Sequence, residues 1–252
     1  MERNQKLLDG EGLLAVLKAV KSQRGGGGQT IVTGGDVRTY ATIDDLYYNG
    51  TAGLAEGTEF KTAGYYHAGD GGGAHYMAKY LYNPSAYPWA IDMGEIEETA
   101  YEVVLKADGT PQTDAETGAY ILKKDSSGNP IPLLDSAGKP KKKHLYACIT
   151  DTTVNYAQFG AKLDGTTDDY QSIYLCHKYQ HDNYTIEPLS ERRHYYIRVE
   201  NHHGIIHKDN NEPIQCCGNI DLSGSQLLVR SQFPGCLLWL QNDWSYLHMY
   251  VK

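Results

Sequence analysis

The chain has 252 residues, enough for one large or two small domains. It carries 31 acidic and 23 basic side chains, a net charge of −8, which disfavours a nucleic-acid partner because phosphate binding requires clustered cations. No apolar stretch is long enough to span a bilayer, and the N-terminus lacks the hydrophobic segment of a secretory signal. We therefore expect synthesis in the cytoplasm and no membrane insertion.

The first predicted element is a helix within residues 1–24. Its apolar side chains follow the spacing of a single stripe: Leu13, Val16, Leu17 and Val20. A helix of this length is not stable alone in water, so we expect it to dock in an oligomer or on another protein. The alternative is an ordinary first helix folded back on its own domain. Four glycines then begin a flexible linker, predicted over residues 25–40, which favours the docked anchor.

A small β-rich domain is predicted over residues 41–150. Thr42 and Asp45 have the spacing of a capping box at a helix start. Two segments rich in Thr, Tyr and Phe, Thr58–Tyr66 and Ala74–Tyr82, predict the strands of a hairpin. The turn between them contains a run that bulkier residues could not replace: Gly69, Asp70, Gly71, Gly72 and Gly73. This run opens a strand, so it lacks the helix N-terminus on which a phosphate cradle depends.

Residues 92–144 differ in composition, because short apolar runs alternate with turns of Asp, Ser, Gly and Pro. Three segments are predicted as strands of a small meander: YEVVLKADG, AYILKKDSSGNP and IPLLDSAGKP. We predict an insertion that projects sideways; the alternative is the edge of the same small domain. The one basic run, Lys139–Lys143, lies in this loop-like stretch and is interpreted as a solvated tip.

The next elements are a short strand over Tyr156–Phe159 and a helix from about Asp168 to Gln180, with Thr166 or Thr167 as its cap. The recurrence of Tyr170, Ile173, Tyr174 and His177 predicts one helix face that covers something beneath it. We interpret this segment as a lid, with these structural residues: Gly160, Asp164, Gly165, Thr167, Asp168, Asp169 and Ile173.

After the lid, short apolar clusters alternate with polar turns, as in a coil of short strands. The predicted clusters are Tyr195–Val199, Gly204–Ile206, Ile214–Cys217, Ile220–Leu222, Leu227–Val229 and Leu237–Leu240. The last cluster lies close to Lys252 with no sign of a terminal cap, so we expect the front end of a longer protein, or one completed by partner chains.

Three segments carry a resemblance to known families. The string NYAQFGAKLDGTTDD, residues 155–169, resembles the opening of the pectate-lyase-like right-handed β-helix superfamily, F-G-A-K-G-D-G-x-T-D-D. Leu163 stands where that family usually has a third glycine, which leaves the conformation of the turn open. Residues 41–80 resemble the N-terminal region of phage tail spikes and tail fibres, which have a G-Y-Y-x-x-G-D-G-G-G turn. Residues 4–28 look like the short anchor sequence of phage fibres.

The resemblance implies a mainly β fold: an N-terminal anchor helix, a small β-rich adaptor domain, and, over residues 151–252, the helix-capped start of a right-handed parallel β-helix. It further implies a homotrimeric structural virion protein, joined through its N-terminus to a phage tail, portal-adaptor or baseplate protein, with host surface polysaccharide as a partner of more distal regions. The superfamily also contains lyases and glycoside hydrolases, so the rival is a polysaccharide depolymerase whose active site lies beyond Lys252 or between subunits. A third, less favoured interpretation is a secreted bacterial adhesin, because the N-terminus lacks a signal segment.

No catalytic residue can be carried over, since the family's catalytic carboxylates lie on coils well past the lid. Asp164, Asp168 and Asp169 could act as paired acids, but their place at a turn and helix start favours structural roles. A histidine-rich loop with loose metal-ligand spacing is interpreted as a solvated turn: His202, His203, His207 and Asp209. Aromatic residues that could stack on sugars are instead assigned to packing: Trp239, Trp244, Tyr246 and Tyr250.

We therefore expect no cofactor and no metal. The five cysteines have no metal-like spacing and are expected as free thiols: Cys148, Cys176, Cys216, Cys217 and Cys236.

Overall fold

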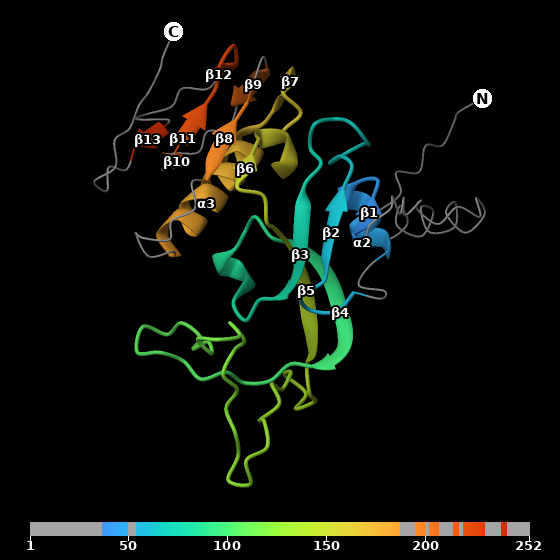
Figure 1. Cartoon of the computed structure of the whole chain (residues 1–252), viewed down its shortest axis with the longest axis vertical. Helices are drawn as coiled ribbons and strands as arrows, with labels where there is room; N and C mark the ends of the chain where they lie inside the picture. Colours follow the sequence, from blue (N-terminus) through green and yellow to red (C-terminus); the bar gives the residue numbers. More distant parts are fainter. Residues whose placement is uncertain are drawn as a thin grey trace, which may run out of the picture.

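The protein is mainly β in the part that the structure describes (Figure 1). The computed structural model describes residues 37–49, 54–186, 195–199, 202–206, 214–216, 219–229 and 238–240. The predicted anchor, with Leu13, Val16, Leu17 and Val20, lies outside these residues. Within them, a five-stranded sheet is followed by groups of short parallel strands, with helices α2 and α3 beside them.

The sheet has the strand order β1-β2-β3-β5-β4. Its strands are β1 (Arg38–Tyr40), β2 (Glu59–Thr62), β3 (His75–Tyr80), β4 (Ile91–Thr99) and β5 (Lys142–Ile149). The predicted hairpin is confirmed as the antiparallel pair β2–β3, with shorter strands than expected. Phe60 and Tyr76 face each other across this pair, with stacked rings 5.6 Å apart. One correction concerns the linker over residues 25–40, whose last three residues form β1 and pair in parallel with β2.

Helix α2 (Ile43–Asn49) shows that the sheet curls into a half-barrel. The helix contacts both β1 and β4, which lie at opposite edges of the strand order, so the sheet must bend around it. The predicted start of α2 is confirmed: the amide of Thr42 donates to the Asp45 carboxylate, and the amide of Asp45 donates to the Thr42 hydroxyl. Leu46 on this helix is fully buried.

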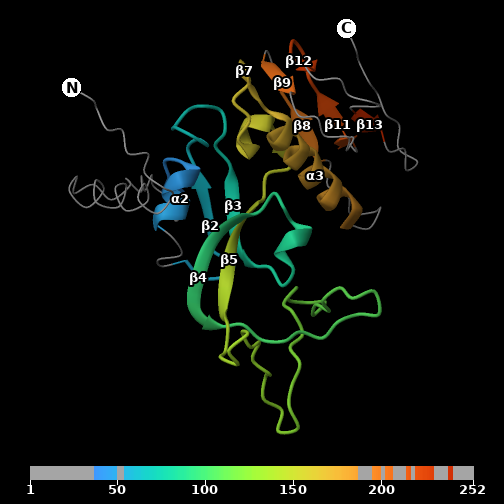
Figure 2. The ribbon, with the colours of Figure 1, turned by 180° about the vertical axis from the view of Figure 1, so that it is seen from behind.

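The insertion is shorter than the predicted residues 92–144, because both ends of that segment belong to strands of the sheet. Residues 100–141 project beyond β4 and β5, at the opposite end of the molecule from the parallel strands (Figures 1 and 2). The hairpin turns of the predicted meander are present, but the segments between them form no continuous ladder. The segment is joined instead by isolated bridges, such as Val103 with Leu122.

Backbone hydrogen bonds in this fully described segment form closed triangles, in which each of three residues donates its amide to the next. The triangles are Ala100, Lys141 and Leu133; Glu102, Ile131 and Lys123; and Val104, Ile121 and Gln112. The hairpin tips beyond them are held by carboxylates, since Asp108, Asp125 and Asp135 each accept a backbone amide two residues on. Ordered turns, with little apolar burial, thus stabilise the insertion.

The parallel strands stack in successive coils, as the apolar clusters after the lid predicted. All six clusters coincide with strands: β8 (Tyr196–Arg198), β9 (His203–Ile206), β10 (Ile214–Cys216), β11 (Asn219–Asp221), β12 (Gln226–Val229) and β13 (Leu238–Leu240). The register pairs Asn219 with Tyr196 one coil earlier, and Leu238 with Ile214 one coil earlier. These two intervals along the chain are nearly equal, as expected for a solenoid in which every coil adds one similar turn.

Two earlier strands begin the stack. β6 (Thr153–Val154) pairs with β8, and β7 (Asp164–Asp168) pairs with β9, in both cases in parallel. Helix α3 (Tyr170–Ile186) contacts β8 and β10 and lies at the end of the stack, next to the sheet (Figure 2). The buried residues of the sheet and of the coils form one cluster, from Tyr40 to Cys216. The predicted domains 41–150 and 151–252 thus share a continuous core.

Three of the predicted free thiols, Cys148, Cys176 and Cys216, are buried and unbridged. Cys217 and Cys236 lie outside the described residues. Among the described helices, none is both long and apolar enough to cross a membrane.

The architecture predicts that the insertion can be removed without loss of the sheet. Since β4 and β5 are already paired up to Thr99 and Lys142, a two-residue Asn-Gly turn in place of residues 101–140 closes the same hairpin. We expect a cooperative thermal transition and a Cys148 thiol that stays unreactive, because Cys148 is buried on β5. Loss of the transition, or rapid labelling of Cys148, would show that the sheet needs the insertion.

Candidate functional site

The candidate site is the junction at which the loop between β2 and β3, residues 63–74, meets residues 151–160. Asp70 shapes this loop: its carboxylate accepts the backbone amides of Tyr65, Tyr66, His67 and Gly72, at 2.7 to 3.1 Å. Partial burial raises the pKa of Asp70, but the four amide donors outweigh it, so the pKa lies below its ordinary value. The loop is therefore held by a carboxylate that is charged at neutral pH.

The glycines of the loop allow the backbone to approach its neighbours closely. A Cβ on Gly72 would lie 2.6 Å from the carbonyl oxygen of Ala157, and one on Gly73 would lie 2.8 Å from that of Thr62. Gly69 and Gly71 both have φ of 84°, a conformation that glycine adopts without strain. The run that the sequence marked as a tight turn thus forms both a turn and a contact surface.

Residues 155–160 form the other side of the junction. The prediction of a strand over Tyr156–Phe159 is wrong, because these residues form a 3-10 helix, η2. Asn155 and Gln158 close a capping box at its start, with each side chain accepting the other's backbone amide. Local side-chain hydrogen bonds therefore override the alternation that suggested a strand.

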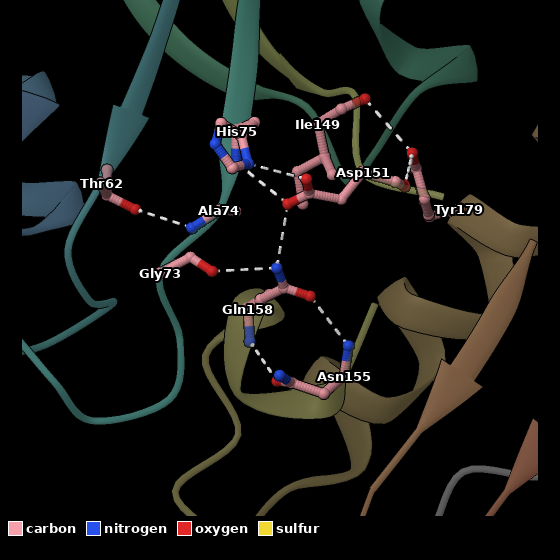
Figure 3. A network of polar contacts seen from close by, with 9 residues as sticks. All are labelled: Thr62, Gly73, Ala74, His75, Ile149, Asp151, Asn155, Gln158 and Tyr179. Carbon is pink, nitrogen blue, oxygen red and sulfur yellow. Dashed lines mark hydrogen bonds and ion pairs between the residues drawn. The ribbon is translucent and has the colours of Figure 1, made fainter. Parts of the chain in front are cut away.

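The same two side chains also reach the loop. Figure 3 shows the contact of Gln158 with Gly73. Gln158 Nε2 donates to the carbonyl oxygen of Gly73 at 2.9 Å, and Asn155 Nδ2 donates to that of Gly71 at 3.1 Å. The hydroxyl of Tyr66 donates to the carbonyl oxygen of Gly160 at 2.7 Å. Three hydrogen bonds thus connect two segments that lie far apart in the sequence.

Asp151 links the sheet to the lid helix. Its Oδ2 accepts the backbone amide of His75 at 3.0 Å and the Gln158 side chain at 3.2 Å, while Oδ1 lies 2.9 Å from His75 Nδ1 (Figure 3). The hydroxyl of Tyr179, on α3, donates to the carbonyl oxygens of Asp151 and Ile149. Strand β3, the end of β5, η2 and α3 therefore meet around one residue.

A second contact joins α3 to the loop that precedes β4. Trp89 Nε1 donates to Asp182 Oδ2 at 2.9 Å, and its ring packs edge-on against Tyr179 with centroids 4.9 Å apart. Lys178 also pairs with Asp182, which is largely buried. The lid helix is thus held by the sheet domain at two places along its length.

The acidic residues of the lid have structural partners that differ from those predicted. Thr166 and Thr167 do not cap the helix, because their hydroxyls and amides bind the carboxylate of Asp164. These hydrogen bonds hold the pKa of Asp164 well below its usual range, and the bond from the backbone amide of Thr167 has the largest effect. The helix begins at Tyr170, whose amide is accepted by Asp168, and continues to Ile186.

Asp169 is buried and accepts the backbone amides of Lys162 and Leu163. Leu163 has φ of 52°, so this leucine adopts the left-handed conformation that glycine favours. The buried side chains of Ile173, Cys176, His177 and Gln180 lie on one face of α3. This buried face agrees with the contacts of α3 with η2, β8 and β10.

The structure brings only part of the predicted site together. Gly69 to Gly73 and Gly160 meet at the junction. Asp164, Gly165 and Thr167 lie instead in β7, where Asp164 is exposed and the other two are partly exposed. Residues that our sequence reasoning missed contribute most of the polar contacts: Tyr66, Trp89, Asp151, Asn155, Gln158 and Tyr179. The Asn-x-x-Gln spacing of the capping box was the one local signal that could have revealed two of them.

The described residues contain no cluster of His, Cys, Asp and Glu suited to hold a metal ion. His207 and Asp209 of the histidine-rich loop, and Trp244, Tyr246 and Tyr250, lie outside those residues. Of the three carboxylates considered as catalytic acids, Asp164, Asp168 and Asp169, each accepts at least one backbone amide. All three carboxylates therefore have structural hydrogen-bond partners in the described residues.

No family model matches the chain. No curated protein matches it either. Among solved structures, the fold is similar to that of WceF of Pantoea stewartii, described as a glycan biofilm modifying enzyme with a bacteriophage tailspike-like parallel beta-helix fold. The identity is 14%, the TM-score is 0.38, and the match covers 79% of this chain and 23% of that one. The chain thus spans less than a quarter of that protein's length, and we argue its function from its own residues.

The ring of Tyr65 lies so close to Gly160 that a single added methyl group should lower stability. Gly160 has φ of 92°, and a Cβ there would lie 2.8 Å from Cζ of Tyr65. We expect Gly160→Ala to lower the free energy of unfolding by about 2–4 kcal/mol, from backbone strain plus displacement of the ring. Gly57→Ala is the matched control, since Gly57 has φ of 86° with open space around it, and should cost about 1 kcal/mol. Equal losses in chemical denaturation would contradict a packed junction.

A charge beneath the lid tests its role as a cover. Ile173 is fully buried, so Ile173→Asp removes a large apolar side chain and buries a carboxylate, which should cost about 4 kcal/mol or more. Gln171→Asp is the control, because Gln171 is exposed in the first turn of the same helix, where a negative charge is tolerated. A melting temperature unchanged in both variants would refute the lid.

Proposed function

We propose that this chain is the particle-proximal part of a bacteriophage tail spike or tail fibre, a homotrimer that attaches a host-binding appendage to the virion. The observation that carries this proposal is the junction. An attachment protein must hold an elongated part at a fixed angle to its base. Here β5 ends at Ile149 and β6 begins at Thr153, and Asp151, between them, bonds to both sides. Such a short, bonded connection transmits force without a hinge.

The two parts joined by this connection suit the two ends of such a protein. The sheet curls around α2 as a half-barrel, which suits a base. The stacked strands pair at nearly the same interval from coil to coil and grow along one axis, as a rod does. We assign to this stack the right-handed winding of tail-spike parallel β-helices. We assign the helix predicted within residues 1–24 as the anchor for a tail, portal-adaptor or baseplate protein, and host polysaccharide binds farther along the rod.

The proposed role is structural and needs no catalytic group in this segment. Asp164, Asp168 and Asp169 serve turns and the start of α3. A depolymerase activity of a longer chain or of an assembled trimer would use carboxylates other than these, and the test below separates that case from a purely structural one.

The test compares the full chain with a variant that lacks residues 1–24, each produced in cells infected by the virus that encodes it and deprived of its own copy. We expect both proteins to be folded trimers by light scattering, and only the full chain to be recovered in purified particles. Recovery of the shortened chain in particles would overturn the anchor assignment. Release of reducing or unsaturated sugar ends from host polysaccharide by residues 1–252, lost on changing Asp164, Asp168 or Asp169 to Asn without loss of folding, would overturn the structural role.

A further inference from the structure

A buried histidine lies between the lid helix and the segment beneath it. His177 is almost fully buried on α3, and its Nε2 lies 3.0 Å from the hydroxyl of Tyr156 in η2. The other ring nitrogen, Nδ1, is buried without a hydrogen-bond partner. In either neutral tautomer, Nδ1 of His177 therefore lacks a hydrogen-bond partner. The protonated ring would place a positive charge and an unpaired Nδ1–H donor in the core.

The groups around this ring cannot compensate for a positive charge. Tyr156 faces it from η2, Cys176 is its neighbour on α3, and Cys216 approaches Tyr156 from β10. Burial raises the pKa of both Tyr156 and Cys176 well above the ordinary values, so neither supplies a negative charge that could pair with a protonated His177. The nearby charged residues of α3, Lys178 and Asp182, pair with each other.

We infer that the Tyr156–His177 pair is an acid-sensitive latch, at which protonation of His177 releases α3 from the first coil while the curled sheet stays folded. The lid is the part that responds, because His177 contacts η2 from the underside of α3. Strands β3 and β5, the second of which carries Cys148, keep their own ladder of hydrogen bonds, although they share the continuous core with α3. The latch adds an acid response to the junction, because α3 also bonds to Asp151 through Tyr179.

The direction and range of the response follow from burial, which lowers the pKa of His177 from 6.5 to about 4. The open lid takes up the proton below about pH 6.5, and the closed lid only near pH 4, so closure is fully stable above pH 6.5 and weakens as the pH falls toward 4. The opening equilibrium should rise about 30-fold between pH 8 and pH 5. The pKa values of Asp70, Asp164 and Asp221 lie below the ordinary value, so these turns remain intact at pH 5.

The buried thiols allow a direct test. Cys176 is buried on the lid helix α3 itself and Cys216 is buried on β10, which α3 contacts, whereas Cys148 lies on β5 in the sheet. We would label the full chain with 4,4′-dithiodipyridine from pH 8 to pH 5 and measure the rate at each cysteine by mass spectrometry. The reference at each pH is His177→Gln, which keeps a polar side chain near Tyr156 but does not titrate.

We expect the ratio of wild-type to His177→Gln labelling rates at Cys176 and Cys216 to rise about 30-fold, with no change of the ratio at Cys148. The control His181→Gln, on the same helix but partly exposed beside Asp182, should respond like the wild type. A constant ratio at Cys176, or an equal rise at Cys148, would overturn the latch.

Should His177→Gln fail to fold, hydrogen exchange of the wild type decides the question. After correction for intrinsic rates, the protection of α3 amides should fall between pH 8 and pH 5 relative to that of β3 and β5. Parallel changes in all three elements would overturn the inference.

Discussion

A methyl group on Gly72 would lie 2.6 Å from the carbonyl oxygen of Ala157, closer than any real contact of a Cβ. This approach lets the side chains of Asn155 and Gln158 reach the carbonyl oxygens of Gly71 and Gly73. The orientation of the sheet relative to the coils depends on it. The contact also lets Gln158 reach Asp151, which in turn bonds to β3 and, through its carbonyl, to α3.

Most of the junction is polar, and its polar groups are satisfied. A buried hydrogen bond contributes only about 1 kcal/mol to stability, whereas an unsatisfied buried group costs more. Such a network therefore adds little net stability. Its main effect is to disfavour other arrangements of the sheet and the lid, in which these groups would lose their partners. The apolar contribution comes from the shared core, where Tyr179 packs against Trp89, Phe159 and Tyr195, residues drawn from three segments of the chain.

Aspartates form hydrogen bonds in many of the described turns, and they titrate differently from His177 on the buried face of the lid helix. The turns at Asp70, Asp108, Asp125 and Asp164 are built on carboxylates whose pKa values lie below the ordinary value, because backbone or side-chain donors favour the charged form. His177 is buried in its neutral form instead. Turns and lid therefore respond to acid in different pH ranges, which gives a single continuous core two levels of stability.

The sequence by itself determined the local elements: the β2–β3 hairpin, the capping box of α2, the glycine-rich turn and all six strands of the later coils. Their signals are short-range, because alternation, turn residues and cap spacing act within a few residues. Local signals also misled where two of them competed, as at Tyr156–Phe159, where the capping box of Asn155 and Gln158 prevailed over the alternation.

Only the tertiary structure decided the strand order, in which β5 lies between β3 and β4, and the hydrogen-bonded triangles of the insertion. It also decided that Asp169 holds the turn at Leu163 and that Trp89 donates a hydrogen bond to Asp182. Each of these depends on hydrogen bonds or packing between residues brought together by folding. The sequence spacing of two residues does not predict such a contact, because the distance between their side chains depends on how the whole intervening chain folds.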